Sequence, residues 1–171
     1  MGIINVTPDS FHKESRRTTV DSAVQAGLKM WRQGATWVDV GGESTRPNAE
    51  PVSIEEELKR VVPVIKALRA ENSEGLISID TRRPDVAQAA LDAGADLIND
   101  VSGFNYEDQS LLKLKKYNVA KVLHHMQGTP NTMQKNPKYK NVLLDIYDFF
   151  EEGIKKIHNK KIIIDPGIGF G

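Results

Sequence analysis

The chain has 171 residues, with 23 acidic and 23 basic side chains and a sequence pI near 6.9. This balance provides no basic surface for nucleic acid, and no apolar run approaches the roughly 20 residues of a membrane-spanning helix. The absence of cysteine excludes disulfides, thiol nucleophiles and thiolate metal sites and leaves the redox compartment open. The default expectation is a cytoplasmic enzyme with neither a nucleic-acid nor a membrane partner.

Six short apolar runs, rich in β-branched residues, alternate with longer segments of helical character. Runs as apolar as these suit strands buried on both faces, so the alternation predicts βα units and a parallel sheet. The runs end in Asn5, Asp39, Asp80, Asn99 with Asp100, His124 with His125, and Asp165. Because the carboxyl ends of parallel strands form one functional rim, these polar ends predict a shared binding site.

Start and stop signals predict helices between the runs, over about residues 20–34, 53–68, 84–94, 106–117 and 142–157. Ser53 and Glu56 form a capping box, Pro63 predicts a kink, and Pro84 suits a first helical turn. No composition shift or linker divides the chain. A single domain is therefore expected.

The segment after the first strand favours a barrel over an open sheet. An open doubly wound sheet usually carries a glycine-rich phosphate loop there, whereas this chain continues as Asn5-Val6-Thr7-Pro8-Asp9-Ser10-Phe11. A (β/α)8 barrel needs about 250 residues. We therefore expect an α/β fold of the TIM-barrel type, of which this chain carries about six βα units.

Two loops have the composition of ligand-binding segments. Gly41-Gly42-Glu43-Ser44-Thr45-Arg46-Pro47 combines glycines, hydroxyls and an arginine, which suits phosphate or pyrophosphate. The alternative for this loop is a flexible surface segment with a solvated arginine. Asp165-Pro166-Gly167-Ile168-Gly169-Phe170-Gly171 places glycines around a phenylalanine, which predicts a sharply bent backbone that passes close to another group.

The remaining carboxylates and amides at strand ends have two interpretations. Groups on Asp80, Asn99 and Asp165 could read the edge of a flat heterocycle that carries an amino group and ring nitrogens. In the structural alternative, Asp80 or Thr81 caps the following helix and Asp100 holds a turn.

Adjacent histidines, His124 and His125, end the fifth strand. Two neighbouring histidines invite a zinc hypothesis, but adjacent residues of a strand point to opposite faces. We therefore do not expect this pair to share a metal ion.

Segments spread over the whole chain resemble dihydropteroate synthase, a folate-pathway enzyme family with a (β/α)8 barrel. The matching segments occur in the family's order and are residues 1–11 (MGIINVTPDSF), 41–47 (GGESTRP), 79–81 (IDT), 98–101 (INDV), 125–130 (HMQGTP) and 165–171 (DPGIGFG). The resemblance implies one domain over residues 1–171, an incomplete pterin-binding (β/α)8 barrel domain with strands one to six.

The resemblance implies a transferase that condenses 6-hydroxymethyl-7,8-dihydropterin pyrophosphate with p-aminobenzoate, giving 7,8-dihydropteroate and pyrophosphate. By matching position, the pterin edge would be held by Asp80, Asn99 and Asp165. The residues that would pack around the pterin ring are Met126, Gly169 and Phe170. The catalytic residues would be Asp80, Asp165 and Arg46.

The resemblance also implies sites for the second substrate, the leaving group and a metal. Thr45 and Arg46 would help to bind the departing pyrophosphate. The p-aminobenzoate pocket would be framed by these two residues with Phe11 and Pro47. Asn5 would contact a Mg²⁺ cofactor and the pyrophosphate.

Two other functions stay open at this point. Corrinoid-type pterin methyltransferases share the barrel and a similar recognition of the pterin edge, but they need no pyrophosphate loop, so residues 42–47 favour the synthase. The chain could also be a non-catalytic pterin-binding fragment. The family's basic segments on strands seven and eight do not occur here, so we expect residues 1–171 alone to lack synthase activity. A homodimer also stays open.

Overall fold

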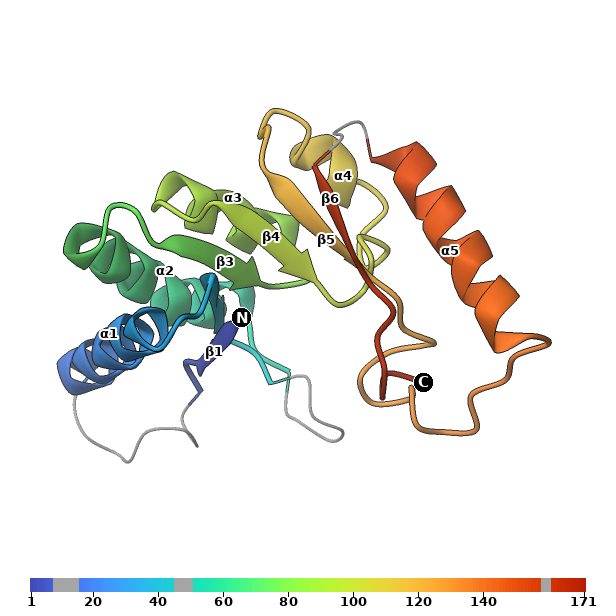
Figure 1. The fold of residues 1–171 in the computed structure, drawn as a ribbon, viewed down its shortest axis with the longest axis horizontal. Helices are drawn as coiled ribbons and strands as arrows, with labels where there is room; N and C mark the ends of the chain where they lie inside the picture. The colour runs from blue at the N-terminus through green and yellow to red at the C-terminus, as the bar shows by residue number, and fades with distance from the viewer. Residues whose placement is uncertain (8–15, 45–50, 158–160) are drawn as a thin grey trace.

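The computed structural model describes residues 1–7, 16–44, 51–157 and 161–171, and these form a curved parallel sheet with helices along its outer side (Figure 1). The six strands are β1 (Gly2–Asn5), β2 (Trp37–Gly41), β3 (Leu76–Asp80), β4 (Leu97–Asp100), β5 (Ala120–His124) and β6 (Ile162–Asp165). Their order in the sheet is β1-β2-β3-β4-β5-β6, and every neighbouring pair is parallel. This sequential order confirms the barrel-type arrangement, because an open doubly wound sheet has its first strand near the centre.

The helices connect successive strands in the described part of the chain. They are α1 (Arg16–Arg32), α2 (Ile54–Glu71), α3 (Pro84–Asp92), α4 (Ser110–Lys113) and α5 (Val142–Lys156). Ser53 is the N-cap of α2, and its hydroxyl accepts a hydrogen bond of 3.2 Å from the backbone N–H of Glu56. Pro84 lies in the first turn of α3, as predicted. None of these helices has the length and apolar character needed to span a bilayer.

One prediction about the helices needs correction. The fourth helix, expected over residues 106–117, is only the short α4, because the bonds of Lys115 and Tyr117 to the carbonyls of Leu112 and Leu114 span three residues instead of four. Such tight turns do not continue an α-helix. Pro63 lies on the exposed side of α2, and the helix continues through it to Glu71, so the expected kink stays a prediction.

The core lies between the sheet and the helices. The strand side chains that face the helices are fully buried and include Val38, Val40, Ile77, Ile79 and Ile98. They join fully buried residues of α2, namely Val61, Val64, Ile65 and Leu68. Burial of each such side chain stabilises the fold by about 1.5–3 kcal/mol. Because strand side chains alternate, the intervening positions face the opposite, inner side of the sheet.

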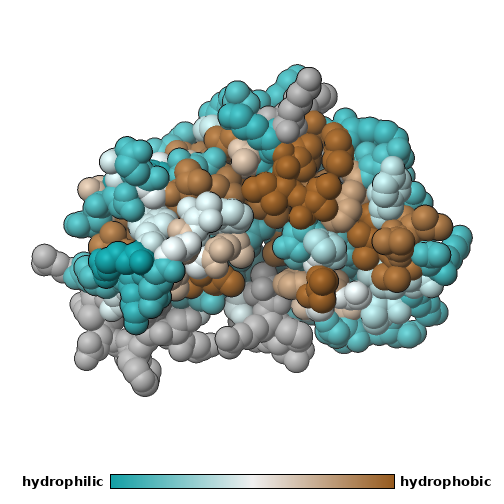
Figure 2. Space-filling view, viewed as in Figure 1, coloured by the Kyte–Doolittle hydropathy of each residue, from teal (hydrophilic) through white to brown (hydrophobic). Residues whose placement is uncertain are grey.

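Apolar side chains also reach the surface over β6 and α5. Figure 2 shows hydrophobic atoms gathered over both elements on the face turned to the viewer. Ile164 of β6 is 50% exposed, and Leu143 and Tyr147 of α5 are 76% and 63% exposed. The helices α1 to α3, in contrast, direct most of their large apolar side chains toward the core, with Ile54 of α2 as an exposed exception.

Candidate active site at the carboxyl ends of the strands

The inner side of the sheet carries a row of polar side chains across β2, β3 and β4. Asp39 of β2 is paired in register with Ser78 of β3, and Asp80 of β3 is paired with Asn99 of β4. Asp39, Ser78 and Asn99 are all buried. Alternation with the apolar residues of the core directs these polar groups away from the helices and toward the inner side.

Asp39 accepts hydrogen bonds from both of its polar neighbours. The hydroxyl of Ser78 donates to Oδ1 of Asp39, and Nδ2 of Asn99 donates to Oδ2 at 2.9 Å. Burial raises the pKa of the Asp39 carboxyl, while the two donated bonds act in the opposite direction by stabilising the carboxylate. Oδ1 of Asn99 is buried and has no hydrogen-bond partner among the described residues.

Asp80 lies beside Asn99 at the end of β3. Burial raises the pKa of the Asp80 carboxyl well above its ordinary value, and the charges of Asp39, Asp100 and Glu57 add to the rise. No hydrogen-bond donor of the described residues meets this carboxyl group. A half-buried carboxyl without a partner among the described residues, next to a buried amide oxygen without one, is the arrangement expected of a ligand-binding surface.

Asp165 ends β6, opposite His124 of β5. Its Oδ2 lies 4.0 Å from Nε2 of His124, and its side chain is 47% exposed. The His124 ring meets Phe170 edge-on, with ring centroids 4.6 Å apart. Burial lowers the pKa of His124, and the charge of Asp165 opposes this effect. The structure therefore brings two of the predicted site residues, Asp165 and Phe170, together around a histidine.

The turn after β6 has the sharp bend that its glycines predict. Gly167 has a φ of +64°, and a Cβ placed there would lie 1.9 Å from the carbonyl oxygen of His125. Oδ1 of Asp165 accepts a hydrogen bond of 2.9 Å from the backbone N–H of Gly167. The aspartate thus supports its own turn while its second oxygen faces His124.

The two adjacent histidines have different neighbours. His124 contacts Phe170, whereas His125 lies 5.0 Å from Phe149 and 6.0 Å from Tyr139, measured between ring centroids. Both therefore pack against aromatic rings, in separate environments.

Asp100 holds a turn, as the structural alternative predicts. Its carboxylate accepts bonds from the N–H (2.8 Å) and the hydroxyl (2.6 Å) of Ser102, so it holds the turn after β4. Burial raises its pKa to about 6.

Neither Asp80 nor Thr81 caps α3, which was the other structural alternative. The N-cap of this helix is Arg83, which makes no side-chain capping bond. The hydroxyl of Thr81 donates to Glu57 at 2.7 Å and accepts the backbone N–H of Arg83 at 3.2 Å, one residue before the helix begins.

A network of ion pairs joins the segments that follow β2 and β3. Glu43 bonds to Arg82 at 2.8 Å and to Arg83 at 3.3 Å, and it also accepts the backbone N–H of Val52 at 3.2 Å. Arg83 also pairs with Glu57, which is 1% exposed. Burial disfavours the charge of Glu43, but the bonds from Arg82 and Val52 outweigh burial and lower its pKa. This network ties the base of the predicted pyrophosphate loop to the end of β3.

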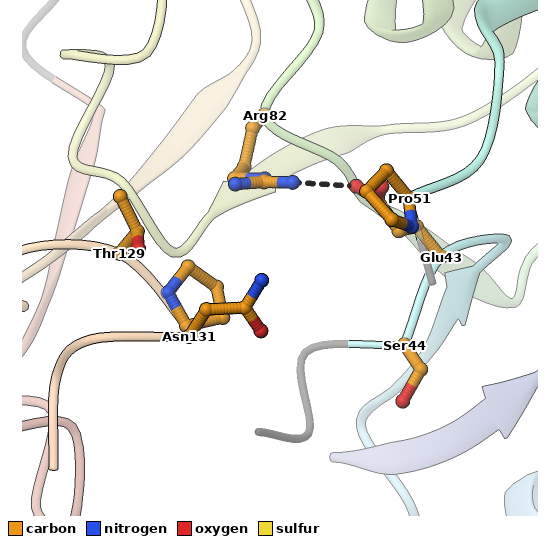
Figure 3. A pocket seen from close by; sticks show the side chains of 7 residues that line it. Glu43, Ser44, Pro51, Arg82, Thr129 and Asn131 are labelled. Carbon is orange, nitrogen blue, oxygen red and sulfur yellow. Dashed lines mark hydrogen bonds and ion pairs between the residues drawn. The ribbon is translucent and has the colours of Figure 1, made fainter. Parts of the chain in front are cut away.

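A small cleft opens above this network, with about 310 Å³ of space between its walls, part of which is open to solvent. In Figure 3 Arg82 points toward Glu43, and Thr129 and Asn131 of the segment after β5 face them across the cleft. The guanidinium of Arg82 also lies 4.5 Å above the Tyr106 ring. The complete lining is Glu43, Ser44, Pro51, Arg82, Thr129, Pro130 and Asn131.

The structure gives less detail on the other predicted site residues. Phe11, Thr45, Arg46 and Pro47 lie outside the described residues. Met126 is half-buried directly after the two histidines, and Gly169 is exposed with a φ of +94°.

The chemistry of Asn5 fits one ligand of a magnesium ion. Asn5 ends β1, beside Gly41 of β2, and its side chain is exposed. Magnesium keeps several waters and takes one or two protein oxygens together with substrate phosphates. The described residues contain no cluster of three or more His, Cys, Asp or Glu side chains suited to a metal ion. In this part of the chain Asn5 would supply one oxygen, and phosphate and water could complete the coordination.

Sequence reasoning named Asp39 only as the end of a strand and overlooked the ion-pair network. β2 in fact continues to Gly41, so Asp39 lies inside the strand. The alternation of Val38, Asp39 and Val40 was the available signal, because it directs the aspartate to the inner face. Glu43 and the arginines lie about 40 positions apart, and no local pattern pairs them.

Comparisons with known proteins agree with the geometry. The chain matches the family model described as pterin binding enzyme over residues 1–171. It is 43% identical over 176 residues to the dihydropteroate synthase of Escherichia coli strain K12, covering 100% of this chain and 62% of that protein. The chain thus spans less than two thirds of the length of such curated relatives.

Solved structures show the same similarity in three dimensions. A dihydropteroate synthase of Xanthomonas albilineans with 4-aminobenzoic acid matches with a TM-score of 0.88 at 43% identity, covering 100% of this chain and 62% of that one. The enzyme of the same organism in complex with 7,8-dihydropteroate matches with a TM-score of 0.83 at 39% identity, covering 99% and 60%.

Proposed function

This chain belongs to the pterin-binding enzyme family, and from that premise we propose that it carries the pterin-binding part of a dihydropteroate synthase. The observation that carries the proposal is the 43% identity to the Escherichia coli synthase over the whole chain. The proposed substrates are 6-hydroxymethyl-7,8-dihydropterin pyrophosphate and p-aminobenzoate, as the ligands named with two related structures suggest. The products are 7,8-dihydropteroate and pyrophosphate.

In this proposal Asp80, Asn99 and Asp165 bind the edge of the pterin. The 2-amino group and ring N–H of a pterin are donors, and carboxylate and amide oxygens are the matching acceptors. The unpartnered Oδ1 of Asn99 and the carboxyl of Asp80 are available for this purpose in the described part of the chain. Met126, Gly169 and Phe170 would cover the flat faces of the ring.

The proposed reaction breaks the C–O bond between the pterin methylene and pyrophosphate, and the amine nitrogen of p-aminobenzoate forms the new C–N bond. The arylamine nitrogen loses a proton, and the pyrophosphate leaves with the electron pair of the broken bond. Positive charge develops on the methylene, so the carboxylates of Asp80 and Asp165 would stabilise the transition state. No side chain needs to act as a nucleophile.

Further residues of the proposal serve the leaving group and the second substrate. Thr45 and Arg46 would bind the pyrophosphate, with Phe11 and Pro47 beside the p-aminobenzoate. Asn5 would hold Mg²⁺, which neutralises phosphate charge when bound. The ion pairs of Glu43 support this assignment, since they fix the base of the loop on which Thr45 and Arg46 lie.

The proposal includes a cytoplasmic location, as for an ordinary biosynthetic enzyme, and assembly as a homodimer. Light scattering on the purified full gene product tests the second point. A mass equal to one chain would exclude the dimer.

The test of function measures dihydropteroate formation by the full gene product, given both substrates and Mg²⁺. We expect turnover that is lost when Mg²⁺ is chelated, and residues 1–171 expressed alone to be inactive. A full gene product that binds no pterin and forms no dihydropteroate would overturn the proposal. Methyl transfer from a methylated pterin would identify the rival methyltransferase function instead.

A further inference from the structure

The inner row of polar groups contains a residue whose partners are all within the protein. Asp39 is 3% exposed, and each of its carboxylate oxygens accepts one side-chain hydrogen bond. Ser78 donates to Oδ1 and Nδ2 of Asn99 donates to Oδ2. Ser78 is level with Asp39 in the sheet, whereas Asn99 is level with Asp80, nearer the rim.

This contact fixes which way the Asn99 amide points. A carboxylate that receives two donors presents only acceptors, so it holds the NH₂ group of Asn99 and excludes its carbonyl. Rotation of the amide by 180° would bring Oδ1 of Asn99 against Oδ2 of Asp39, where neither atom can donate. Oδ1 is consequently held away from Asp39, buried and without a partner among the described residues.

We propose that Asp39 is a positioning residue, which fixes the Asn99 amide so that its Oδ1 accepts a hydrogen bond from the 2-amino group of a pterin. The site thereby selects a 2-amino pteridine over its 2-oxo counterpart. This inference rests on the proposed function, because it assigns the ligand to the same site. Asp39 itself touches no ligand and acts only through Asn99.

The selectivity follows from the cost of an unmatched pair of acceptors. A 2-oxo pteridine, or lumazine, carries a carbonyl where a pterin carries its amino group. That carbonyl would meet Oδ1 of Asn99, and the amide cannot turn to offer its NH₂ while Asp39 holds it. Sites that hydrogen-bond a polar group discriminate strongly against an analogue that lacks it, because their own buried groups are then unpaired.

The test measures dissociation constants of 6-hydroxymethylpterin and 6-hydroxymethyl-lumazine for the full gene product by calorimetry. We expect the unsubstituted protein to prefer the pterin by about 100-fold or more. In Asp39→Asn, the new amide can turn either its oxygen or its NH₂ group toward Asn99, because the Ser78 hydroxyl can pair with whichever group remains. The Asn99 amide can then adopt both orientations. The preference for the pterin should therefore fall by about tenfold.

A swapped pair separates positioning from a general structural role. Asn99→Asp alone brings two carboxylates together, and we expect it to weaken pterin binding by about 10- to 100-fold. In Asp39→Asn with Asn99→Asp, the amide at position 39 accepts from Ser78 and donates to the carboxylate at position 99, whose other oxygen faces the ligand. We expect this double variant to regain most of the affinity and the selectivity.

The matched control is Asp96→Asn, whose carboxylate lies at the opposite end of the strands and accepts from Arg69 and the backbone of Ile77. This variant should lose stability without a change in selectivity. If the swapped pair does not fold, NMR of the unsubstituted protein tests the inference instead. The side-chain amide protons of Asn99 should exchange slowly with solvent, because the Asn99 amide is held by Asp39. Fast exchange would overturn the inference.

The two proposals fail in different ways. An unsubstituted protein that binds neither pteridine would overturn the proposed function, and this inference with it. Pterin binding with unchanged selectivity in Asp39→Asn, or an Asn99→Asp defect that the swap does not relieve, would overturn the inference alone.

Discussion

Glu57 and Arg83 form an ion pair in which both side chains are nearly inaccessible, at 1% and 9% exposure. The pair connects α2 to the segment after β3, and Glu57 also receives the hydroxyl of Thr81. Its position below the loop that follows β2 makes it a structural support for the rim.

Removal of one partner of this pair should strongly destabilise the fold. Glu57→Gln leaves the Arg83 charge buried with only the longer contact to Glu43, and we expect a loss of about 3 kcal/mol. Glu55→Gln, on the exposed side of the same helix, breaks only an exposed pair with Lys59 and should lower the midpoint of urea denaturation slightly. Glu57→Met combined with Arg83→Met should cost less than Glu57→Gln, because no buried charge remains. Equal midpoints for Glu55→Gln and Glu57→Gln would contradict this prediction.

Stability should fall as pH rises from about 4 to 6. The pKa of Asp100 is raised from 3.8 to about 6, so the folded state binds a proton more tightly than the unfolded chain in this range. Stability from this group is complete below pH 4 and decreases by up to about 3 kcal/mol by pH 6. The raised pKa values of Asp39 and Asp80 act in the same direction.

Asp100→Asn is the variant that checks this pH dependence. The amide oxygen can still accept from Ser102, but the group no longer titrates. Urea denaturation at several pH values should show a shallower slope between pH 4 and 6 than in the unsubstituted protein. Asp108→Asn, at an exposed position, is the control and should keep the original slope.

Gly167→Ala should be much more harmful than Gly169→Ala. Both glycines have positive φ, so each substitution incurs about 1–2 kcal/mol of backbone strain. Only the Cβ at position 167 meets a backbone atom, the carbonyl oxygen of His125, which cannot move aside as a flexible side chain could; nothing lies within 4 Å of the Cβ at position 169. Thermal melting of the two variants compares these costs, and equal melting temperatures would refute the predicted clash.

Asp80→Asn should weaken the binding of 6-hydroxymethylpterin by about 10- to 100-fold, because an amide replaces one acceptor with a donor. Affinity in the unsubstituted protein should rise with pH, since burial and neighbouring charges raise the pKa of Asp80 and only the ionised form accepts from two N–H groups. Isothermal calorimetry over a pH series measures both effects. A pH-independent affinity would exclude this role for the carboxylate.

The strands could be predicted from the sequence because each is a short apolar run that ends in a polar residue. Five of the six observed strands end at a predicted polar residue, and β2 alone continues further, to Gly41. The end of α4 was not predictable in this way, because the apolar spacing of Leu111, Leu112 and Leu114 is compatible with both an α-helix and a series of tighter turns.

The site was only partly predictable. Asp80, Asn99 and Asp165 occupy strand ends, which any parallel sheet directs to one rim. The partner of Asn99 depends on the register between three strands, which a single sequence does not specify. The bond between Asp39 and Asn99 therefore emerges only in the folded chain.

The sequential order of the strands has a consequence for how the chain acquires its structure. Each strand pairs with the next one along the chain, with one connecting segment between them. The pairings among the described strands therefore join segments that are synthesised one after the other. A nascent polypeptide emerging from the ribosome can therefore add one strand and its covering helix at a time.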